Sequence, residues 1–311
     1  MPTRRQSFWP GQQRQAYREG TGGKPGRITW HGGHSMNSPQ NATVITLIVP
    51  LFNEVESVGL LASSLSNLKR ALEADARHVL HLRLVDDGST DGTLAALQQT
   101  FATWQNLEIL RHPSNQGIAA AIMTGLHSAQ TEIACSLDAD CTYDPLTLVP
   151  MLERLTDGVD LVTASPYHPE GMVLNVPRWR LWLSKAASRL YRLALGLPLH
   201  TYTSCCRVYR RSAVVDLELR HGGFQGVAEL LVLLALRGGK IVEQPAVLSV
   251  RRHGKSKMRL LRTILGHLSL IVRTCRLRAG AAAANALGSA IGSPSPRTPR
   301  LLPTQLERTT A

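Results

Sequence analysis

Runs rich in β-branched and other apolar residues alternate with helical patterns over the middle of the chain. Such alternation predicts an α/β fold, with a mostly parallel twisted sheet and helices on both faces. Ligands of such sheets bind beyond the carboxyl ends of the strands. The predicted strands span residues 44–49, 80–85, 107–110, 132–137 and 159–164, and the predicted helices span 56–72, 93–103, 118–129 and 146–155.

Further elements follow in the second half of the chain. We expect a helix rich in Trp, Leu and Arg at 177–195, a strand at 207–209, a helix at 225–236 and a strand at 247–250. A stretch in which arginines interrupt apolar residues then predicts an amphipathic helix at 259–278.

The two ends of the chain differ in composition from this middle part. Residues 1–42 are rich in Gly, Gln, Arg and Pro without periodicity, which predicts a disordered basic arm. Residues 279–311 combine an Ala run with a Pro-rich segment, which predicts a flexible tail. The α/β domain is therefore expected at 43–258, followed by the helix at 259–278.

Composition excludes several classes of protein. With 43% hydrophobic and 18% charged residues in a chain of 311, collagen-like and wholly disordered chains are excluded. The five cysteines form an odd set without a C-x-x-C pair, so neither a disulfide framework nor a structural zinc site is expected. A reducing, cytoplasmic setting fits best. No apolar run reaches the ~20 residues that a membrane-spanning helix needs.

Positive charge is concentrated near the C-terminus. Of a net charge of +13, the segment from 244 to 306 holds 11 basic residues and no acidic one. In the expected helix, Arg259, Arg262, Arg273 and Arg276 alternate with apolar residues, as in helices that lie on an anionic membrane surface. A helix packed on its own domain is the alternative. Nucleic acid is disfavoured because no recognition motif is present and aromatic residues are few.

Three of the predicted strands end in polar loops, at 50–54, 86–92 and 138–140. In a parallel sheet all three open on the same edge, although each alone is ordinary turn sequence. Asp138 and Asp140 follow an apolar strand one residue apart, a pattern suited to Mg²⁺ that keeps positions for a diphosphate and water. No G-x-G-x-x-G fingerprint or Walker lysine loop occurs, so dinucleotide oxidoreductases and P-loop NTPases are disfavoured.

Together these segments resemble the family 2 glycosyltransferases, and among them the dolichyl-phosphate mannosyltransferase group. The resemblance covers about residues 44–260 and rests on the order of the motifs. The R-x-x-G-x-S-K stretch at 251–257 points to polyprenyl-phosphate acceptors. The segment 203–211 is similar to the group's S-G-F-R-x-Y-R-R, with Cys205 and Cys206 where Gly and Phe are usual.

The resemblance implies a GT-A (nucleotide-diphospho-sugar transferase) fold and an inverting transfer of a hexose, mannose or glucose, from a GDP- or UDP-sugar to a polyprenyl phosphate. It also implies Mg²⁺ or Mn²⁺ as cofactor. The cysteines and the basic amphipathic helix predict a peripheral location at the cytoplasmic face of a membrane. By position, the residues implied to bind the nucleoside are Pro50, Phe52, Glu54, Val85 and Asp87. Those implied to bind the diphosphate and the metal are Asp138, Ala139, Asp140 and Thr142. Those implied to bind phosphate groups of the donor or acceptor are Arg251 and Lys257.

One position departs from the group's pattern. Pro166 stands where the resemblance implies a donor-binding arginine, and a proline supplies no guanidinium; Arg178 or Arg180 could compensate. This departure leaves the sugar nucleotide open.

The acceptor determines whether the reaction needs a base. A phosphate monoester is already anionic at neutral pH, so it needs cations for alignment and no general base. A sugar-hydroxyl acceptor on a glycan or glycolipid would need a base, for which Glu229 is the candidate, its alternative being a solvated helix residue. Two other classes stay open: a haloacid-dehalogenase-like phosphatase, from the D-x-D-x-T pattern at 138–142, and a non-catalytic adaptor that keeps the fold.

Overall fold

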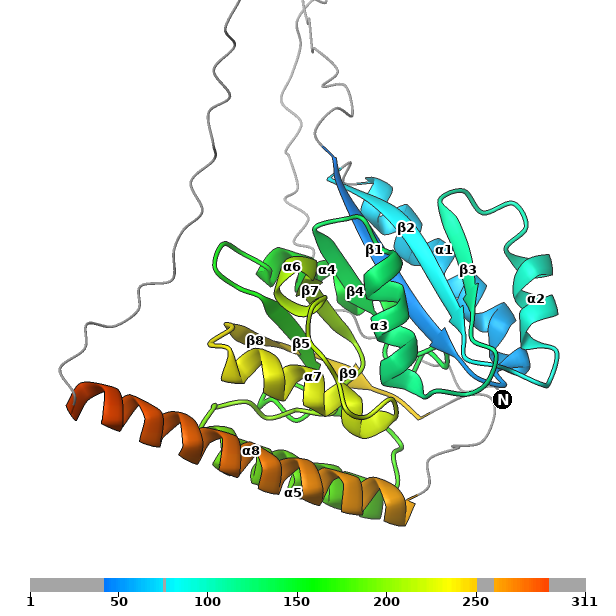
Figure 1. Cartoon of the computed structure of the whole chain (residues 1–311). Coiled ribbons are helices and arrows are strands. Elements are labelled where there is room, and N and C mark those ends of the chain that lie inside the picture. The colour runs from blue at the N-terminus through cyan, green and yellow to red at the C-terminus, as the bar shows by residue number, and fades with distance from the viewer. Residues whose placement is uncertain (1–41, 75–76, 251–259, 291–311) are drawn as a thin grey trace, which may run out of the picture. The chain divides into compact units, whose positions relative to one another are not determined.

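The computed structural model describes residues 42–74, 77–250 and 260–290. A seven-stranded sheet with the order β3-β2-β1-β4-β7-β5-β8 forms the centre of the domain (Figure 1). Only β7 runs antiparallel to its neighbours β4 and β5, so the expectation of a mostly parallel sheet is confirmed. The strands are β1 (Thr43–Leu51), β2 (His78–Asp86), β3 (Leu107–Arg111), β4 (Ile133–Ser136), β5 (Leu161–Ser165), β7 (Arg207–Arg210) and β8 (Ile241–Pro245), with β6 (Met172–Val173) and β9 (Val247–Leu248) as a separate parallel pair.

Helices cover both faces of the sheet, as its buried strands require. Alternate side chains of β1 point to opposite faces: Leu47 packs with α1, α2 and α4, whereas Ile48 packs with α3 and α7. The helices are α1 (Val58–Ala74), α2 (Thr93–Thr100), α3 (Ile118–Ser128), α4 (Leu148–Arg154), α5 (Arg178–Leu195), α6 (Arg211–Val214), α7 (Phe224–Leu236) and α8 (Leu260–Ala290), with short 3-10 turns η1 (Val55–Ser57) and η2 (Pro145–Thr147).

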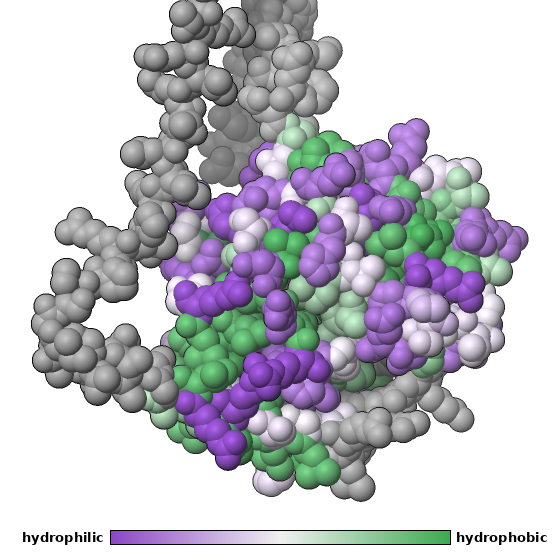
Figure 2. Space-filling model, viewed as in Figure 1, coloured by the Kyte–Doolittle hydropathy of each residue, from purple (hydrophilic) through white to green (hydrophobic). Residues whose placement is uncertain are grey.

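A third cluster joins α5, α7 and α8. Tyr191 of α5, Leu231 of α7 and Leu270 of α8 are buried against one another. As a result α5 and α8 lie side by side at one end of the domain (Figure 1). In the same view, Figure 2 shows apolar patches interrupted by hydrophilic ones around this end.

Two of the differences from the sequence prediction lie in the second half of the chain. Helix α8 continues to Ala290, past residue 278, where the predicted helix ends. The Ala-rich stretch explains the extension, because Ala has the highest helix propensity. Strand β8 was not predicted; it contains Glu243 and Gln244, and its five residues are all half-buried. Edge strands of this kind lack the continuous apolar run that reveals the inner strands.

Candidate functional site

The loops after β1 and β2 are locked together at one edge of the sheet. The N–H of Asp87 donates to the carbonyl of Leu51 at 2.8 Å. The N–H of Asn53 donates to Oγ of Ser89 at 2.8 Å, and the N–H of Thr90 donates to Oδ1 of Asn53 at 2.7 Å. Asn53 has a φ of 53°, a left-handed conformation that Asn adopts more readily than most residues. The expected meeting of the first two loops is therefore observed.

The implied nucleoside residues have different environments within these loops. Pro50 and Val85 face each other in the β1–β2 register and are both buried. Phe52 is half-buried. Glu54 is buried, where its N–H donates to Oγ1 of Thr93 at 2.8 Å and its carboxylate accepts from Oγ of Ser57.

The Asp87 carboxylate is almost fully enclosed and accepts bonds from one short segment. The backbone N–H groups of Gln116 and Gly117 donate to its two oxygens at 2.8 and 2.7 Å, and the side-chain amide of Asn115 donates at 3.0 Å. Nδ1 of the buried His112 lies 2.7 Å from Oδ1. Asp87 therefore fixes the start of α3, a role that the sequence analysis missed.

The third loop follows β4 and contains the two expected metal ligands. Asp138 and Asp140 are half-buried, Ala139 is buried, and Oδ1 of Asp140 accepts from the N–H of Thr142 at 3.1 Å. Asp138 and Thr142 line a small pocket of about 160 Å³. Pro166 lines the same pocket, so the position of the missing arginine does face this site.

The donor set of this loop fits a hard divalent cation. Two half-buried carboxylates separated by one residue supply oxygen ligands, which Mg²⁺ and Mn²⁺ prefer, and leave coordination positions for other groups. Within the ranges that the structure describes, no cluster of three or more His, Cys, Asp and Glu side chains occurs. A metal here would therefore take further ligands from substrate or water.

Cys205 shares the pocket with Asp138. Burial raises the pKa of the Cys205 thiol well above its usual value, and the negative charge of Asp138 raises it further. Cys205 is therefore a neutral thiol beside the carboxylate.

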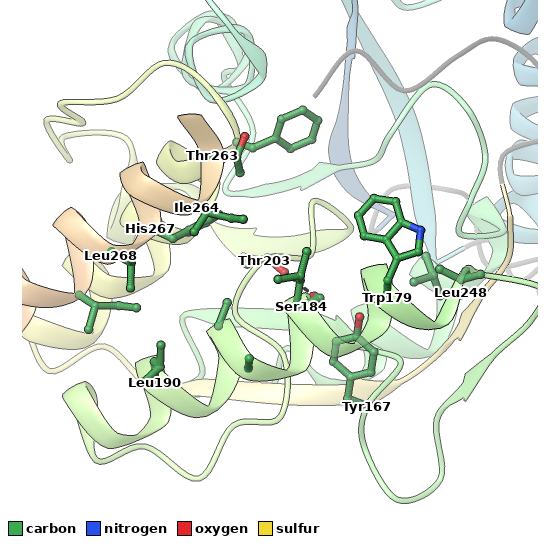
Figure 3. A pocket seen from close by; sticks show the side chains of 16 residues that line it. Tyr167, Trp179, Ser184, Leu190, Thr203, Leu248, Thr263, Ile264, His267 and Leu268 are labelled. Atoms are coloured by element: carbon green, nitrogen blue, oxygen red, sulfur yellow. Dashed lines mark hydrogen bonds between the residues drawn. The ribbon is translucent and has the colours of Figure 1, made fainter. Parts of the chain in front are cut away.

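A larger pocket of about 370 Å³ lies between α5 and α8 and was not predicted (Figure 3). Its walls are mainly apolar, with Leu190 contributed by α5 and Ile264 and Leu268 by α8. It adjoins the pocket of Asp138, because five residues line both: Tyr167, Ser184, Thr203, Phe224 and Leu248.

The chain that leads into the R-x-x-G-x-S-K stretch reaches this junction. Leu248 lines both pockets, and the N–H of Ser249 donates to the carbonyl of Thr142 at 2.9 Å. Arg251 and Lys257 lie outside the described residues. The described segment 77–250 thus ends close to the third loop.

Glu229 is fully buried in α7, so it is not a solvated helix residue. Its Oε2 accepts from the N–H groups of Arg220 and His221 at 3.0 and 3.1 Å and lies 2.9 Å from Nδ1 of His221, and its Oε1 accepts from the Arg273 guanidinium. It lines neither of the two pockets.

The comparisons with known proteins agree with this architecture. The family model "Glycosyl transferase family 2" matches residues 46–217, and the chain therefore belongs to that family. It is a glycosyltransferase of the dolichyl-phosphate mannosyltransferase-like group, as two relatives show. It is 30% identical over 227 residues to "Polyprenol monophosphomannose synthase" of Mycolicibacterium smegmatis, a match that covers 71% of this chain and 82% of that protein. It is 27% identical over 231 residues to "Dolichol-phosphate mannosyltransferase" of Pyrococcus furiosus, covering 74% of this chain and 63% of that protein.

A solved structure shows the same GT-A fold. Glucosyl-3-phosphoglycerate synthase from Mycobacterium tuberculosis, in complex with Mn²⁺, UDP and phosphoglyceric acid, superposes with a TM-score of 0.58 and 18% identity. The match covers 76% of this chain and 79% of that one. Among the described helices, none combines the length and hydropathy of a membrane span.

Proposed function

We propose that this protein transfers a hexose, mannose or glucose, from a GDP- or UDP-sugar to a polyprenyl phosphate at a membrane surface. The observation that carries the proposal is the continuity of two pockets: a polar one lined by Asp138 and Thr142, and an apolar one between α5 and α8. A lipid phosphate needs this combination, because its anionic head must reach the donor while its chain stays out of water. The names of the two relatives point to the same class of acceptor.

The donor half of the reaction is assigned to the three loops at the sheet edge. Phe52 and its neighbours in the locked β1 and β2 loops would take the nucleoside, and Asp138, Asp140 and Thr142 would hold Mg²⁺ or Mn²⁺. When bound, the metal supplies positive charge that offsets the charge developing on the departing nucleoside diphosphate. The Mn²⁺ and UDP named for the Mycobacterium tuberculosis structure support this assignment.

The acceptor half needs cations and no base. An anionic phosphate oxygen is already nucleophilic, so the task is to hold two anions that repel each other. We assign that task to Arg251 and Lys257, since the chain before them is bonded to Thr142 beside the metal loop. A hydroxyl acceptor has less support, because Glu229, its candidate base, is enclosed by protein donors and lines neither pocket.

Helices α5 and α8 are assigned to the membrane surface. Trp182 and Leu193 of α5 are 72% and 78% exposed, and Leu265 of α8 is 66% exposed. Exposed large apolar side chains together with arginines are typical of helices that lie in the lipid interface. The cytoplasmic face and the anionic lipid partner belong to this proposal.

A transfer assay tests the proposed function. The purified protein is incubated with Mn²⁺ or Mg²⁺, a polyprenyl phosphate and, in turn, labelled GDP-mannose, GDP-glucose, UDP-glucose and UDP-galactose. We expect label to enter the organic phase with GDP-mannose, GDP-glucose or UDP-glucose, and only when both the lipid phosphate and the metal are present. Absence of transfer from all four donors would refute the proposal, and hydrolysis of p-nitrophenyl phosphate instead would support the phosphatase.

A further inference from the structure

The carboxylate of Glu229 connects helix α8 to the loop that precedes α7. On one side it accepts from the guanidinium of Arg273, which lies on α8. On the other it accepts from the backbone N–H groups of Arg220 and His221 and contacts the His221 ring. Because Glu229 is fully buried, these donors replace all of the water that a carboxylate would otherwise bind.

The same loop lies directly on the first turn of α3. The carbonyl of Gly222 accepts from the N–H groups of Ala119 and Ala120 at 2.6 and 3.1 Å. The approach is so close that a Cβ on Gly222 would lie 2.1 Å from the carbonyl oxygen of Gln116. A Cβ on Gly117, which has a φ of +100°, would lie 2.5 Å from the carbonyl oxygen of Gly222. Neither residue can gain a side chain without moving the backbone.

The residues just before α3 are held by Asp87. The N–H groups of Gln116 and Gly117 donate to the Asp87 carboxylate, which follows the last residue of β2. The segment from Asn115 to Ala120 is therefore hydrogen-bonded both to Asp87, at the sheet edge proposed to bind the donor, and to the loop that Glu229 holds.

These contacts form a continuous series from α8 to the donor edge. We propose that Glu229 is a positioning residue, which couples the seating of α8 through Arg273 to the order of residues 115–120 and hence to donor binding. Helix α8 also forms one wall of the apolar pocket. The coupling would therefore make the affinity for the donor depend on the position of the helix that contacts the lipid. This inference rests on the proposed function, which supplies the donor and the lipid.

The energetics favour such coupling. Removing one partner of a buried charge pair leaves the other unpaired in a medium of low dielectric constant, which costs more than losing an exposed pair. If Arg273 moves away with α8, Glu229 loses its one guanidinium among the described contacts. The loop at 220–223 must then rearrange or admit water. Its rearrangement breaks the hydrogen bonds that the Gly222 carbonyl accepts from α3.

Amide hydrogen exchange of the unliganded protein tests the coupling without any turnover. Arg273→Gln is compared with Arg273→Lys, which keeps the charge, and with Arg276→Gln, which removes an exposed arginine one turn away on the same helix. We expect Arg273→Gln to speed exchange in peptides covering 115–121 and 219–223 by about tenfold, and Arg276→Gln to leave these peptides unchanged. Arg273→Lys should restore most of the protection.

Exchange in peptides of α1 distinguishes coupling from general loss of stability. We expect no change there, because α1 lies on the opposite face of the sheet from α3 and α7. Unchanged exchange at 115–121 in Arg273→Gln, or equal acceleration in every peptide, would overturn the proposal. Because the readout needs neither donor nor lipid, it is independent of whether the transfer assay succeeds.

Steady-state kinetics separate a positioning role of Glu229 from a catalytic one. We expect Glu229→Gln to raise KM for the donor about five- to tenfold, to lower kcat much less, and to leave the pH profile of kcat unchanged. Loss of kcat at saturating donor, together with loss of the acidic limb of the pH profile, would mean that Glu229 is the base and would overturn the proposal.

Discussion

Nδ1 of His112 lies 2.7 Å from Oδ1 of Asp87, and both side chains are buried behind the donor edge of the sheet. Because a carboxylate accepts, Nδ1 donates to it, and Nε2 on the other side of the ring lies 2.9 Å from Oγ1 of Thr124. His112 thus fixes Asp87 between the end of β3 and helix α3. This arrangement holds the carboxylate that orders residues 115–117.

Replacing His112 tests this arrangement. We expect His112→Phe to lower the free energy of unfolding by about 1–3 kcal/mol, because it removes one hydrogen-bond partner of the buried Asp87 carboxylate and the His112 partner of Thr124. Urea denaturation measures the change. His127→Phe, on the exposed side of α3, is the matched control and should leave stability nearly unchanged. Equal stability of His112→Phe and the parent would mean that the His112–Asp87 contact contributes nothing.

Asp140→Asn tests the metal assignment. The substitution keeps an oxygen that can accept from the Thr142 N–H but removes the negative charge, so the fold should persist while metal-dependent turnover is lost. The control is Asp144→Asn, which keeps the N-terminal cap of η2. Turnover within about threefold of the parent at saturating metal would contradict the assignment.

The apolar pocket between α5 and α8 is tested by a polar side chain in its wall. Leu268→Gln should raise KM for a short-chain, water-soluble polyprenyl phosphate about tenfold, since the lost apolar contact is worth about 1–2 kcal/mol, and should leave KM for the donor unchanged. Leu265→Gln, on the same helix but outside the pocket, is the control. An equal effect of both variants would show that the chain does not bind there.

The exposed apolar residues of α5 are expected to hold the protein on membranes. Trp182→Ser combined with Leu193→Ser should reduce cosedimentation with anionic vesicles severalfold even at 1 M salt, because apolar insertion is not screened by ions. Val79→Ser, an exposed position on β2, should not change it. Undiminished pelleting of the double variant would assign membrane contact to another surface.

Acidification should weaken the packing of α8 through His267. Burial, with a smaller contribution from the charge of His221, lowers the pKa of His267 from its usual value of 6.5. Burial also raises the pKa of Tyr191, so its hydroxyl keeps its proton and donates to Nδ1 of the neutral His267 at 2.8 Å.

The sign of the pH effect follows from this shift. The unfolded state binds a proton more readily than the folded state, so stability is fully present above pH 6.5 and falls as pH drops through the lower folded pKa. We expect His267→Gln to flatten this fall when unfolding is measured at pH 7.5, 6.5 and 5.5. A parallel fall in parent and variant would remove His267 as the cause.

The strands and helices in the first half of the chain were predictable, because the pattern of apolar and polar residues there matches which side chains are buried. β1 is a mainly apolar run that is buried from Ile45 onward, β2 alternates apolar and polar residues before its buried end, and their polar loops follow where a parallel sheet places ligands. The partners of Asp87 were not predictable, since His112 lies 25 residues away and nothing local marks the pair. The pocket between α5 and α8 and the burial of Glu229 likewise arise from packing between helices distant in sequence.

The acceptor is the central claim, and one comparison tests it most directly. Initial rates of transfer are measured with a polyprenyl phosphate and with the free polyprenol of the same chain length, at the same donor and metal concentrations. We expect transfer to the phosphate alone, because the alcohol needs a base and neither pocket is lined by Glu229, the candidate base. Transfer to the polyprenol at an equal or greater rate would contradict it.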